Sequence, residues 1–444
     1  MNKMNKMFYL LNVGVSGVKG IKEEVKLYFY KKTVDKDFNP QKYRIKAIYG
    51  ENGSGKSALI TAVNIFRDLI LKEHYLVESR TQMFLNEIIN KISHTFKFNC
   101  EFLVQLSSGE KQIYYYAFEI GQGSTAAYVL KHEILKVRKG NYPNSKYTTI
   151  FECDKGELVN LDCGPEQRKE IERKTLNLLE TNPFVHLYIE NYLKETILID
   201  GLIFHMISLF IFVLLLKIYI AEEDQHELYF FKRRIKENDF NEALPMDTWR
   251  ELISGMNELS SVNEKIIHKS NYKKYKERVE QLTRFIKIFK KDLVSIDIDA
   301  KENGENYECE LNLNYGGFCI NKEFESTGIK KLIRLFDCFV AVSHGGIVFV
   351  DEMDSNLNDV YLCKLIEYFM YYGEGQLCFT THNLDPMTVL KDNKNSIDFL
   401  SSDNHLVSWV SRGNAKPDNC YKNGMIEDLP FNVEAADFIG LFGE

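Results

Sequence analysis

A glycine-rich run around one lysine constrains the fold of this chain more than any other feature. Residues 50–57 read Gly-Glu-Asn-Gly-Ser-Gly-Lys-Ser and fit the pattern GxxxxGK[ST]. An apolar, strand-like stretch precedes the run, and a helix is predicted over 57–71 with Leu59, Val63 and Phe66 on one face. Because glycines let backbone N–H groups surround a phosphate, this strand–loop–helix predicts a cradle for the phosphates of a nucleotide.

The side chains at the end of the run have expected roles in binding ATP and Mg²⁺. Lys56 would reach the β- and γ-phosphates, and the Ser57 hydroxyl would be a ligand of Mg²⁺. The expected nucleotide-binding residues of this loop are Asn52, Gly53, Ser54, Gly55, Lys56, Ser57 and Ala58.

A second motif lies far along the chain, where residues 345–352 read Gly-Gly-Ile-Val-Phe-Val-Asp-Glu. Four continuous apolar residues predict a strand buried on both faces, and open α/β sheets bind ligands at the carboxyl ends of such strands. Asp351 would hold Mg²⁺, and Glu352 would polarise the attacking water. A buried strand ending in a solvated acidic turn is the alternative, but the pairing with the glycine-rich run favours a nucleotide site.

Two further segments bear on the kind of nucleotide site. A short apolar strand over 376–381 ends at His382, which would contact the γ-phosphate, although a lone histidine is more often structural. Ser326 is predicted to open a helix that continues to Val342. Serine at a helix start is ordinarily a cap, but its position 25 residues before Asp351 favours a functional role.

The order and spacing of these motifs resemble the ATP-binding-cassette heads of SMC-like and OLD-like ATPases. The run at 50–57 is similar to Walker A, Ser326-Thr-Gly328 to a degenerate signature motif, and Val348–Glu352 to Walker B. Residues 355–358 are similar to the D-loop, and His382 to the switch histidine. Within that class, the chain resembles the compact ATPases of bacterial phage-defence modules of the Septu, PARIS and AbiL types.

The resemblance implies an α/β fold, an ABC-type P-loop ATPase head with a mixed sheet, interrupted by a helical insertion. It implies ATP and Mg²⁺ as cofactors, and Lys56, Glu352 and His382 as the catalytic residues. It also implies a homo-oligomer in which Ser326 and Gly328 of one head complete the ATP site of another. The start of the Ser326 helix suits this role, because its free N–H groups attract a γ-phosphate.

The chain departs from the family pattern at two places. The Q-loop has no clear equivalent, and Gln82 is a candidate beside the ordinary interpretation as a helix-surface glutamine. The D-loop region has Asn358 where many relatives have histidine. This second departure bears on the efficiency of hydrolysis more than on ATP binding, and slow turnover is consistent with it.

Composition shifts divide the chain into three parts. Residues 1–164 are predicted to form the N-terminal part of the head, 165–290 a helical insertion or dimerisation region, and 291–444 the C-terminal part with the signature motif, Walker B and His382. Within the first part, successive strands are expected over 96–104, 113–120 and 128–137. An α/β unit interrupted by helices accounts for this pattern.

The insertion contains an uncharged run of 15 residues, Leu202–Leu216. A membrane span needs about 20 apolar residues, so a buried or subunit-interface helix is favoured over membrane contact. The run is flanked by Asp200 and Lys217, which stop its extension. We therefore expect no stable membrane insertion.

A basic segment, Lys265–Lys291, carries interleaved tyrosines and could contact the backbone of nucleic acid; a solvated helix face is the alternative. A smaller patch, Lys232-Arg233-Arg234, has the same two interpretations. Arg233, Glu237 and His268 loosely resemble the Arg/Glu/His set of ATPase-linked anticodon nucleases, but arginine and glutamate four apart are common helix pairs. Effector chemistry is therefore expected in a separate protein.

Charge and cysteine content narrow the function classes. The net charge of −7 means that nucleic acid could bind only through a local basic patch, and nine scattered cysteines without CxxC favour reduced thiols in a cytoplasmic chain. The favoured function is an ATPase sensor or scaffold that controls a separate nuclease or toxin in antiphage defence. A DNA-repair ATPase of the same head class and an ATP-gated assembly protein with little turnover are the alternatives.

Overall fold

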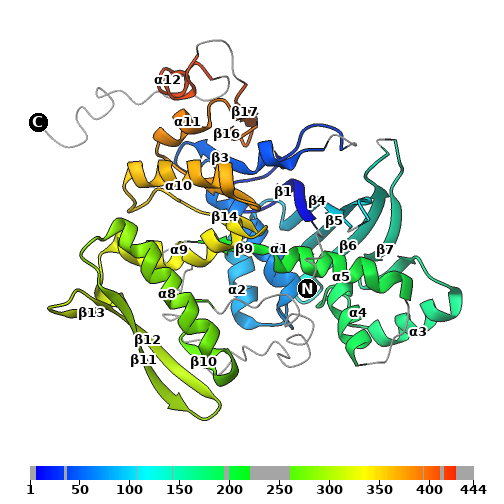
Figure 1. The fold of residues 1–444 in the computed structure, drawn as a ribbon. Coiled ribbons are helices and arrows are strands. Elements are labelled where there is room, and N and C mark those ends of the chain that lie inside the picture. The colour runs from blue at the N-terminus through cyan, green and yellow to red at the C-terminus, as the bar shows by residue number, and fades with distance from the viewer. Residues whose placement is uncertain are drawn as a thin grey trace, which may run out of the picture.

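The chain has a mixed α/β fold. In this computed structural model the described residues form three β-sheets with helices between and around them (Figure 1). The structure describes residues 7–34, 38–106, 108–142, 144–194, 200–220, 261–393, 395–410 and 415–426. The charged patch at 232–234 and Glu237 lie outside these ranges.

Regular elements follow one another along the described chain. The strands are β1 (Met7–Ser16), β2 (Val25–Tyr28), β3 (Ile45–Gly50), β4 (Thr95–Gln105), β5 (Lys111–Gln122), β6 (Tyr128–Lys139), β7 (Thr148–Asp154), β8 (Glu157–Leu161), β9 (Leu216–Tyr219), β10 (Ile266–His268), β11 (Ser295–Asn303), β12 (Asn306–Asn314), β13 (Cys319–Asn321), β14 (Ile347–Val350), β15 (Gln376–Thr380), β16 (Ile397–Leu400) and β17 (Leu406–Ser408). The α-helices are α1 (Lys56–Leu71), α2 (Ser79–Ile88), α3 (Pro165–Thr175), α4 (Phe184–Leu193), α5 (Asp200–Leu214), α8 (Tyr272–Phe289), α9 (Thr327–Ser343), α10 (Asp359–Tyr372), α11 (Asp385–Leu390) and α12 (Pro417–Lys422). Short 3-10 helices are η1 (Pro40–Tyr43), η4 (Lys269–Asn271) and η5 (Lys322–Phe324).

A six-stranded sheet forms the centre of the fold, in the order β17-β16-β3-β15-β14-β9. Neighbouring strands run parallel, except β16 and β17. Every residue of β3, β14, β15 and β16 is buried, as expected for parallel strands covered on both faces. The carboxyl ends of β3, β14 and β15 therefore meet at one edge of the sheet.

A seven-stranded antiparallel sheet, β2-β1-β4-β5-β6-β7-β8, covers one side and lies on the right of Figure 1. The three strands expected over 96–104, 113–120 and 128–137 are confirmed as β4, β5 and β6. Helices α1 and α5 pack against this sheet through stacked rings. Phe66 of α1 stacks on Phe98 at 4.6 Å between ring centroids, and Phe212 of α5 stacks on Phe102 at 4.0 Å.

A second hydrophobic core lies on the opposite face of the central sheet, where α8, α9 and α10 pack with β11 and β12. Helix α9 buries Leu332, Leu335 and Phe336 there, and its apolar residues recur at helical spacing. The small sheet β10-β12-β11, with β13 on β12, lies beside α8 at the lower left of Figure 1. This lobe sets the position of α9 relative to β14.

The region 165–290 is not purely helical, which corrects part of the prediction. Leu216–Tyr219 forms β9, which pairs in parallel with β14 and so belongs to the central sheet. The apolar run of α5 continues almost directly into β9 at the edge of the central sheet. Helical periodicity therefore does not reveal where the helix ends and the strand begins. The boundaries 1–164, 165–290 and 291–444 stay a prediction.

The apolar run Leu202–Leu216 is largely helix α5, ending before β9. Leu202, Met206, Leu209 and Val213 are each no more than 2% exposed, so this face of the helix belongs to the protein core. None of the described helices combines the length and the apolar character that a membrane crossing requires.

Candidate functional site

The predicted phosphate cradle lies between β3 and α1. Gly55 caps α1 in a left-handed conformation (φ 103°), which glycine adopts without strain, and no side chain of the described residues caps the first N–H groups of the helix. Gly50 is closely approached by another strand, since a Cβ atom there would lie 2.4 Å from the carbonyl oxygen of Leu400. The strand–loop–helix expected at 50–57 is therefore present, with free backbone donors at the helix start.

Lys56 is buried within this loop, and its Nζ donates to the carbonyl oxygens of Gly50 and Glu51, both at 2.9 Å. Burial lowers the pKa of Lys56, while the nearby carboxylates of Asp351 and Glu352 act in the opposite direction and raise it. The lysine of the first motif and the acids of the second thus share one electrostatic environment.

The other loop residues differ in what they can contribute. Ser54 is buried, and its hydroxyl has no hydrogen-bond partner within the described part of the chain. Ser57 is half-buried, whereas Asn52 and Gly53 are exposed. The side chain of Ala58 is buried in the core, so this position can offer only its backbone N–H to a ligand.

The acids follow β14 as predicted, and a threonine organises them. Asp351 is 1% exposed; its Oδ1 accepts a hydrogen bond from the hydroxyl of Thr380 at 2.5 Å, and its Oδ2 has no partner among the described residues. The backbone N–H of Glu352 donates to the same hydroxyl at 2.7 Å. Glu352 has φ 46°, a left-handed conformation that is strained for glutamate and common at functional sites.

His382 follows β15 and lies in the same charged neighbourhood. Its backbone N–H donates to Oδ2 of Asp354 at 3.3 Å. Desolvation and then the Lys56 ammonium lower the pKa of His382, while Asp354 and Glu352 oppose them. The structure therefore brings Lys56, the two acids after β14 and His382 together.

The predicted signature segment is exposed and lies beside the predicted D-loop. Ser326 is exposed and precedes α9 at the cap position, but its side chain makes no hydrogen bond to the first N–H groups of the helix within the part of the chain that the structure describes. At Gly328, a Cβ atom would lie 2.7 Å from the carbonyl oxygen of Asn356, which explains the need for glycine. Within the described residues, no hydrogen bond joins Ser326 or Gly328 to the 50–57 loop.

Lys331 is a site residue that the sequence did not single out. It is 4% exposed, and its Nζ donates to the carbonyl oxygen of Glu352 and the hydroxyl of Ser355. Burial lowers its pKa to about 8, against the opposing effect of Asp354 and Glu352. Lys331 therefore links α9 to Glu352, which follows β14, and to Ser355 of the predicted D-loop.

The sequence marks Thr380, Asp354 and Lys331 only weakly as site residues. Thr380 precedes His382 by two positions at the end of a predicted strand, which marks it as close to the site edge. Asp354 lies three residues after Asp351, between the predicted Walker B acids and the predicted D-loop. Nothing in the sequence distinguishes Lys331 from its neighbour Lys330.

Gln82 does not fit the predicted Q-loop role. Its amide nitrogen donates to the carbonyl oxygens of Leu76 and Tyr128, and its amide oxygen accepts from the N–H of Tyr128 at 2.7 Å. The side chain thus fastens α2 to β6. Asn358 caps α10, since its Oδ1 accepts from the N–H of Val360 at 3.0 Å.

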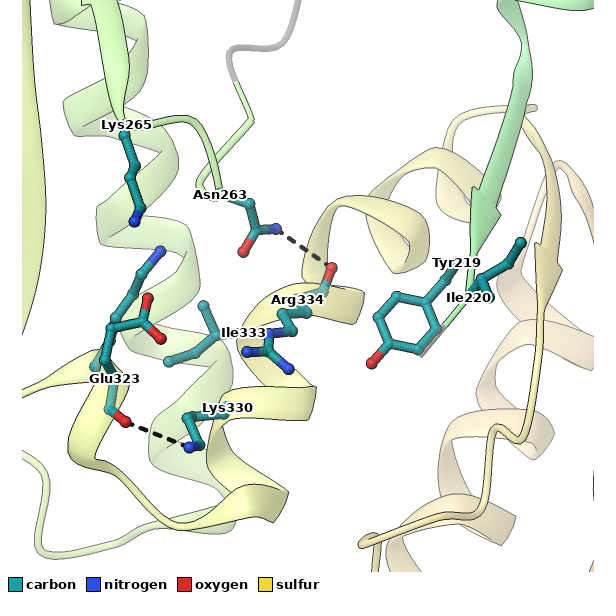
Figure 2. A pocket seen from close by; sticks show the side chains of 9 residues that line it. Tyr219, Ile220, Asn263, Lys265, Glu323, Lys330, Ile333 and Arg334 are labelled. Atoms are coloured by element: carbon teal, nitrogen blue, oxygen red, sulfur yellow. Dashed lines mark hydrogen bonds between the residues drawn. The ribbon is translucent and has the colours of Figure 1, made fainter. Parts of the chain in front are cut away.

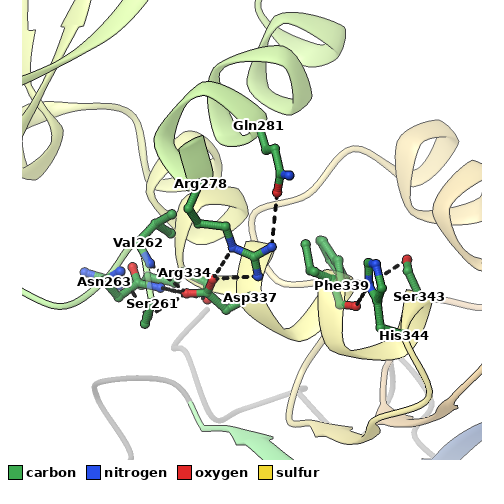
Figure 3. Close-up of polar contacts among 11 residues, drawn as sticks. Ser261, Val262, Asn263, Arg278, Gln281, Arg334, Asp337, Phe339, Ser343 and His344 are labelled. Atoms are coloured by element: carbon green, nitrogen blue, oxygen red, sulfur yellow. Dashed lines mark hydrogen bonds and ion pairs between the residues drawn. The ribbon is translucent and has the colours of Figure 1, made fainter. Parts of the chain in front are cut away.

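Part of the predicted basic surface at Lys265–Lys291 is core. Arg278 is 4% exposed and pairs with Asp337 at 3.2 Å (Figure 3). Tyr275 is fully buried. The same carboxylate of Asp337 accepts from Ser261 and the N–H of Val262. The helix turns these side chains inward, a placement that counting charges does not show. The basic residues of the segment that remain exposed are Lys265, Lys273, Lys274, Lys276, Arg284, Lys287 and Lys291.

His268, the one described member of the nuclease-like set, contacts its own neighbourhood. Its Nδ1 lies 2.7 Å from the hydroxyl of Ser270 in the 3-10 turn that follows β10. This contact is a local turn interaction and adds nothing to a catalytic interpretation.

The similarity of this chain to known proteins is weak. No family model matches the chain, and no curated protein matches it. Two solved structures of the recombination mediator protein RecF in the RecFOR pathway, one with ATP and one described as RecF-ATPrS, can be superposed on it. The RecF-ATPrS structure has 13% identity and a TM-score of 0.39 over 92% of this chain and 100% of RecF; the RecF-ATP structure has 14% and 0.37 over 91% and 100%. These values are too low to assign a family.

Proposed function

We propose that this chain binds ATP with Mg²⁺ at the 50–57 loop and hydrolyses it with residues that follow β14 and β15. One observation carries the proposal: the ammonium of Lys56 interacts electrostatically with Asp351 and Glu352, although about 300 residues separate them in sequence. A glycine-rich helix start beside paired carboxylates is the arrangement that phosphoryl transfer requires.

The residues present fit a magnesium ion. Mg²⁺ prefers oxygen ligands and binds through one or two carboxylates together with phosphates. The buried Oδ2 of Asp351 has no partner among the described residues, and Ser57 offers a hydroxyl at the start of α1. We propose these two groups as the ligands of Mg²⁺, which when bound would neutralise charge on the phosphates.

Each protein group has a distinct task in this proposal. The backbone N–H groups of 52–58 hold the phosphates, and Lys56 reaches the terminal ones. Glu352 orients the attacking water through its carboxylate. His382, whose pKa is lowered, is neutral at pH 7 and donates a hydrogen bond to the γ-phosphate.

We further propose that two copies pair around ATP, so that Ser326 and Gly328 of one copy face the γ-phosphate bound by the other. The exposure of Ser326 and the absence of a side-chain cap at the start of α9 support this arrangement. A helix start with free N–H groups attracts an anion.

Replacing Lys56 tests the binding site directly. Lys56→Ala should weaken ATP binding by at least about tenfold, because it removes a charged hydrogen bond to phosphate. Equilibrium dialysis with labelled ATP measures this change. Lys301→Ala, on exposed β11, is the matched control and should bind like the wild type. Equal binding by Lys56→Ala and the wild type would refute the site.

Two finer roles are compatible with an ATPase of this kind. We favour a sensor or scaffold in antiphage defence that controls a separate nuclease or toxin, and a DNA-repair ATPase is the alternative. Phosphate release measured with and without DNA separates them, since strong stimulation by DNA would favour repair. An ATP-bound chain with no measurable turnover would instead favour an ATP-gated assembly protein.

A further inference from the structure

The face of α9 that carries Lys330, Ile333 and Arg334 borders a cavity of about 400 Å³ (Figure 2). Its walls come from the end of β9, the segment before β10, η5 and α9. Cavities of this size typically accept small organic ligands. No group assigned to the proposed ATP site lines it.

Among the described residues that line the cavity, four carry a cationic side chain and one carries a carboxylate. Lys265, Lys322, Lys330 and Arg334 are the cations, and Glu323 is the carboxylate. The Nζ of Lys330 donates to the backbone carbonyl oxygen of Glu323 at 3.3 Å, so this contact neutralises no charge. Figure 2 shows Lys265 and Lys330 approaching the cavity from different elements.

The cationic side chains around the cavity repel one another. Burial lowers the pKa of Lys322, and Lys265 and Arg334 lower it further by repulsion, while Glu323 and Glu310 oppose this effect. Glu310 also accepts a hydrogen bond from the amide of Asn321 at 3.0 Å. A set of cations that repel one another in a cavity is stabilised when a multivalent anion enters.

We infer that this cavity is a second ligand site, separate from the ATP site, and that it binds a phosphate-bearing anion through Lys322, Lys330 and Lys265. Lysine ammonium groups bind phosphate oxygens by charge-assisted hydrogen bonds. Several of them converging on one cavity favour two or more phosphates over a single carboxylate. Ile333 and the ring of Tyr219 add an apolar wall that suits the organic part of a nucleotide.

The phosphates can come from a free nucleotide-like molecule or from the backbone of nucleic acid, and the experiment has one arm for each. Isothermal titration calorimetry with inorganic tripolyphosphate probes the first source. Fluorescence anisotropy with a labelled single-stranded oligonucleotide of about 16 nucleotides probes the second. Both are carried out on the full chain at low salt, because such binding weakens as salt increases.

Four variants separate the two sites and control for charge. Lys322→Glu and Lys330→Glu should each weaken binding at the cavity by at least about tenfold. Lys301→Glu makes the same charge change on exposed β11 and should bind like the wild type. Lys56→Ala should lose binding at the ATP site but keep binding at the cavity, so the failure of one proposal is distinguishable from the failure of the other.

Two results support the inference, and they name the source. Tripolyphosphate binding that Lys322→Glu weakens supports a small-molecule ligand, and an effect seen only with the oligonucleotide supports nucleic acid. If Lys322→Glu and Lys301→Glu bind both probes equally, the cavity is not an anion site.

A neutral variant guards against loss of folding. Lys322→Gln removes a charge that burial disfavours and that Lys265 and Arg334 repel, so its melting temperature should equal or exceed that of the wild type in the absence of ligand. Tripolyphosphate should then raise the melting temperature of Lys56→Ala but not that of the double variant Lys56→Ala, Lys322→Gln. An equal shift in both would overturn the proposal.

Discussion

Adjacent lysines of α9 project into opposite electrostatic surroundings. Lys331 is buried on the side of β14, where its ammonium contacts Glu352 and Ser355 and is close to Asp354. Lys330 borders the cavity, where the cations outnumber the carboxylates among the described lining residues. The ring of Tyr219 belongs to both regions, because it lines the cavity and lies 5.9 Å from the Nζ of Lys331.

The difference shows how charge balance separates two kinds of site. On the β14 side the carboxylates of Asp351, Glu352 and Asp354 lie near the cations Lys56 and Lys331 and favour their charged forms. In the cavity the cations repel one another, so an anionic ligand would contribute most there. Preorganised charge suits catalysis, whereas unbalanced charge suits binding.

The largest effect is expected from Glu352→Gln, which tests whether the β14 side carries out chemistry. This change removes the carboxylate that orients water but keeps the shape of the side chain. Turnover should fall by roughly 10³-fold, within the range for loss of a general base. ATP binding should persist, and the pair of heads should accumulate. Phosphate release and gel filtration with ATP measure the two outcomes.

Glu280→Gln, an exposed change on α8, is the control and should leave turnover unchanged. A Glu352→Gln protein that hydrolyses ATP at the wild-type rate would remove Glu352 from the mechanism. One that stays monomeric with ATP would contradict pairing of the heads.

A smaller effect is expected from the matched pair Lys331→Met and Lys330→Met. Lys331→Met frees the carbonyl of Glu352 and the hydroxyl of Ser355 from their common donor, so both loops lose a fixed position. Turnover should fall about tenfold, since misplaced catalytic groups slow the reaction. Lys330→Met should keep wild-type turnover and weaken binding of tripolyphosphate at the cavity. Phosphate release and calorimetry on both variants give the comparison.

Equal turnover in the two variants would show that α9 does not support the acidic loop. If Lys331→Met loses activity, Lys331→Arg should restore part of it, because guanidinium can donate to both oxygens. A variant that merely unfolds would show no such recovery.

The sequence predicted the motifs better than their connections. The strand before Gly50, the helix after it and the strand ending at Asp351 all follow from runs of apolar residues whose spacing matches one element. The meeting of Lys56 with Asp351 could be expected because parallel strands align their carboxyl ends. Local pattern and general topology were sufficient for this part of the site.

The features that the sequence did not predict concern the direction in which side chains face and the pairing of distant segments. Arg278 and Lys331 look like surface charges within charged segments, yet each is 4% exposed and has a specific partner. β9 joins the central sheet through pairing with β14, more than 100 residues later in the chain. Such placements result from packing between distant segments, and no local periodicity encodes them.

The smallest effect concerns pH, and it uses the lowered pKa of Lys331. In the folded chain this pKa is about 8, compared with 10.5 for a free lysine. Above pH 8 the folded protein loses the ammonium that donates to Glu352 and Ser355, so turnover should fall a few-fold between pH 7 and 9. Stability should change in the opposite direction. Between about pH 8 and 10.5 the unfolded chain binds more protons at this site, so stability rises with pH there relative to Lys331→Met.

Because turnover falls while the contribution of Lys331 to stability rises, the test is selective for Lys331. A general alkaline loss of structure would lower turnover and stability together, whereas titration of Lys331 lowers turnover while its contribution to stability rises. Lys331→Arg stays protonated over this range, so its turnover should not show the decline near pH 8. Lys330→Met should retain the wild-type decline, because Lys330 lies on the other side of α9. A decline near pH 8 that persists in Lys331→Arg would assign the titration to a different group and leave the two sides of α9 independent.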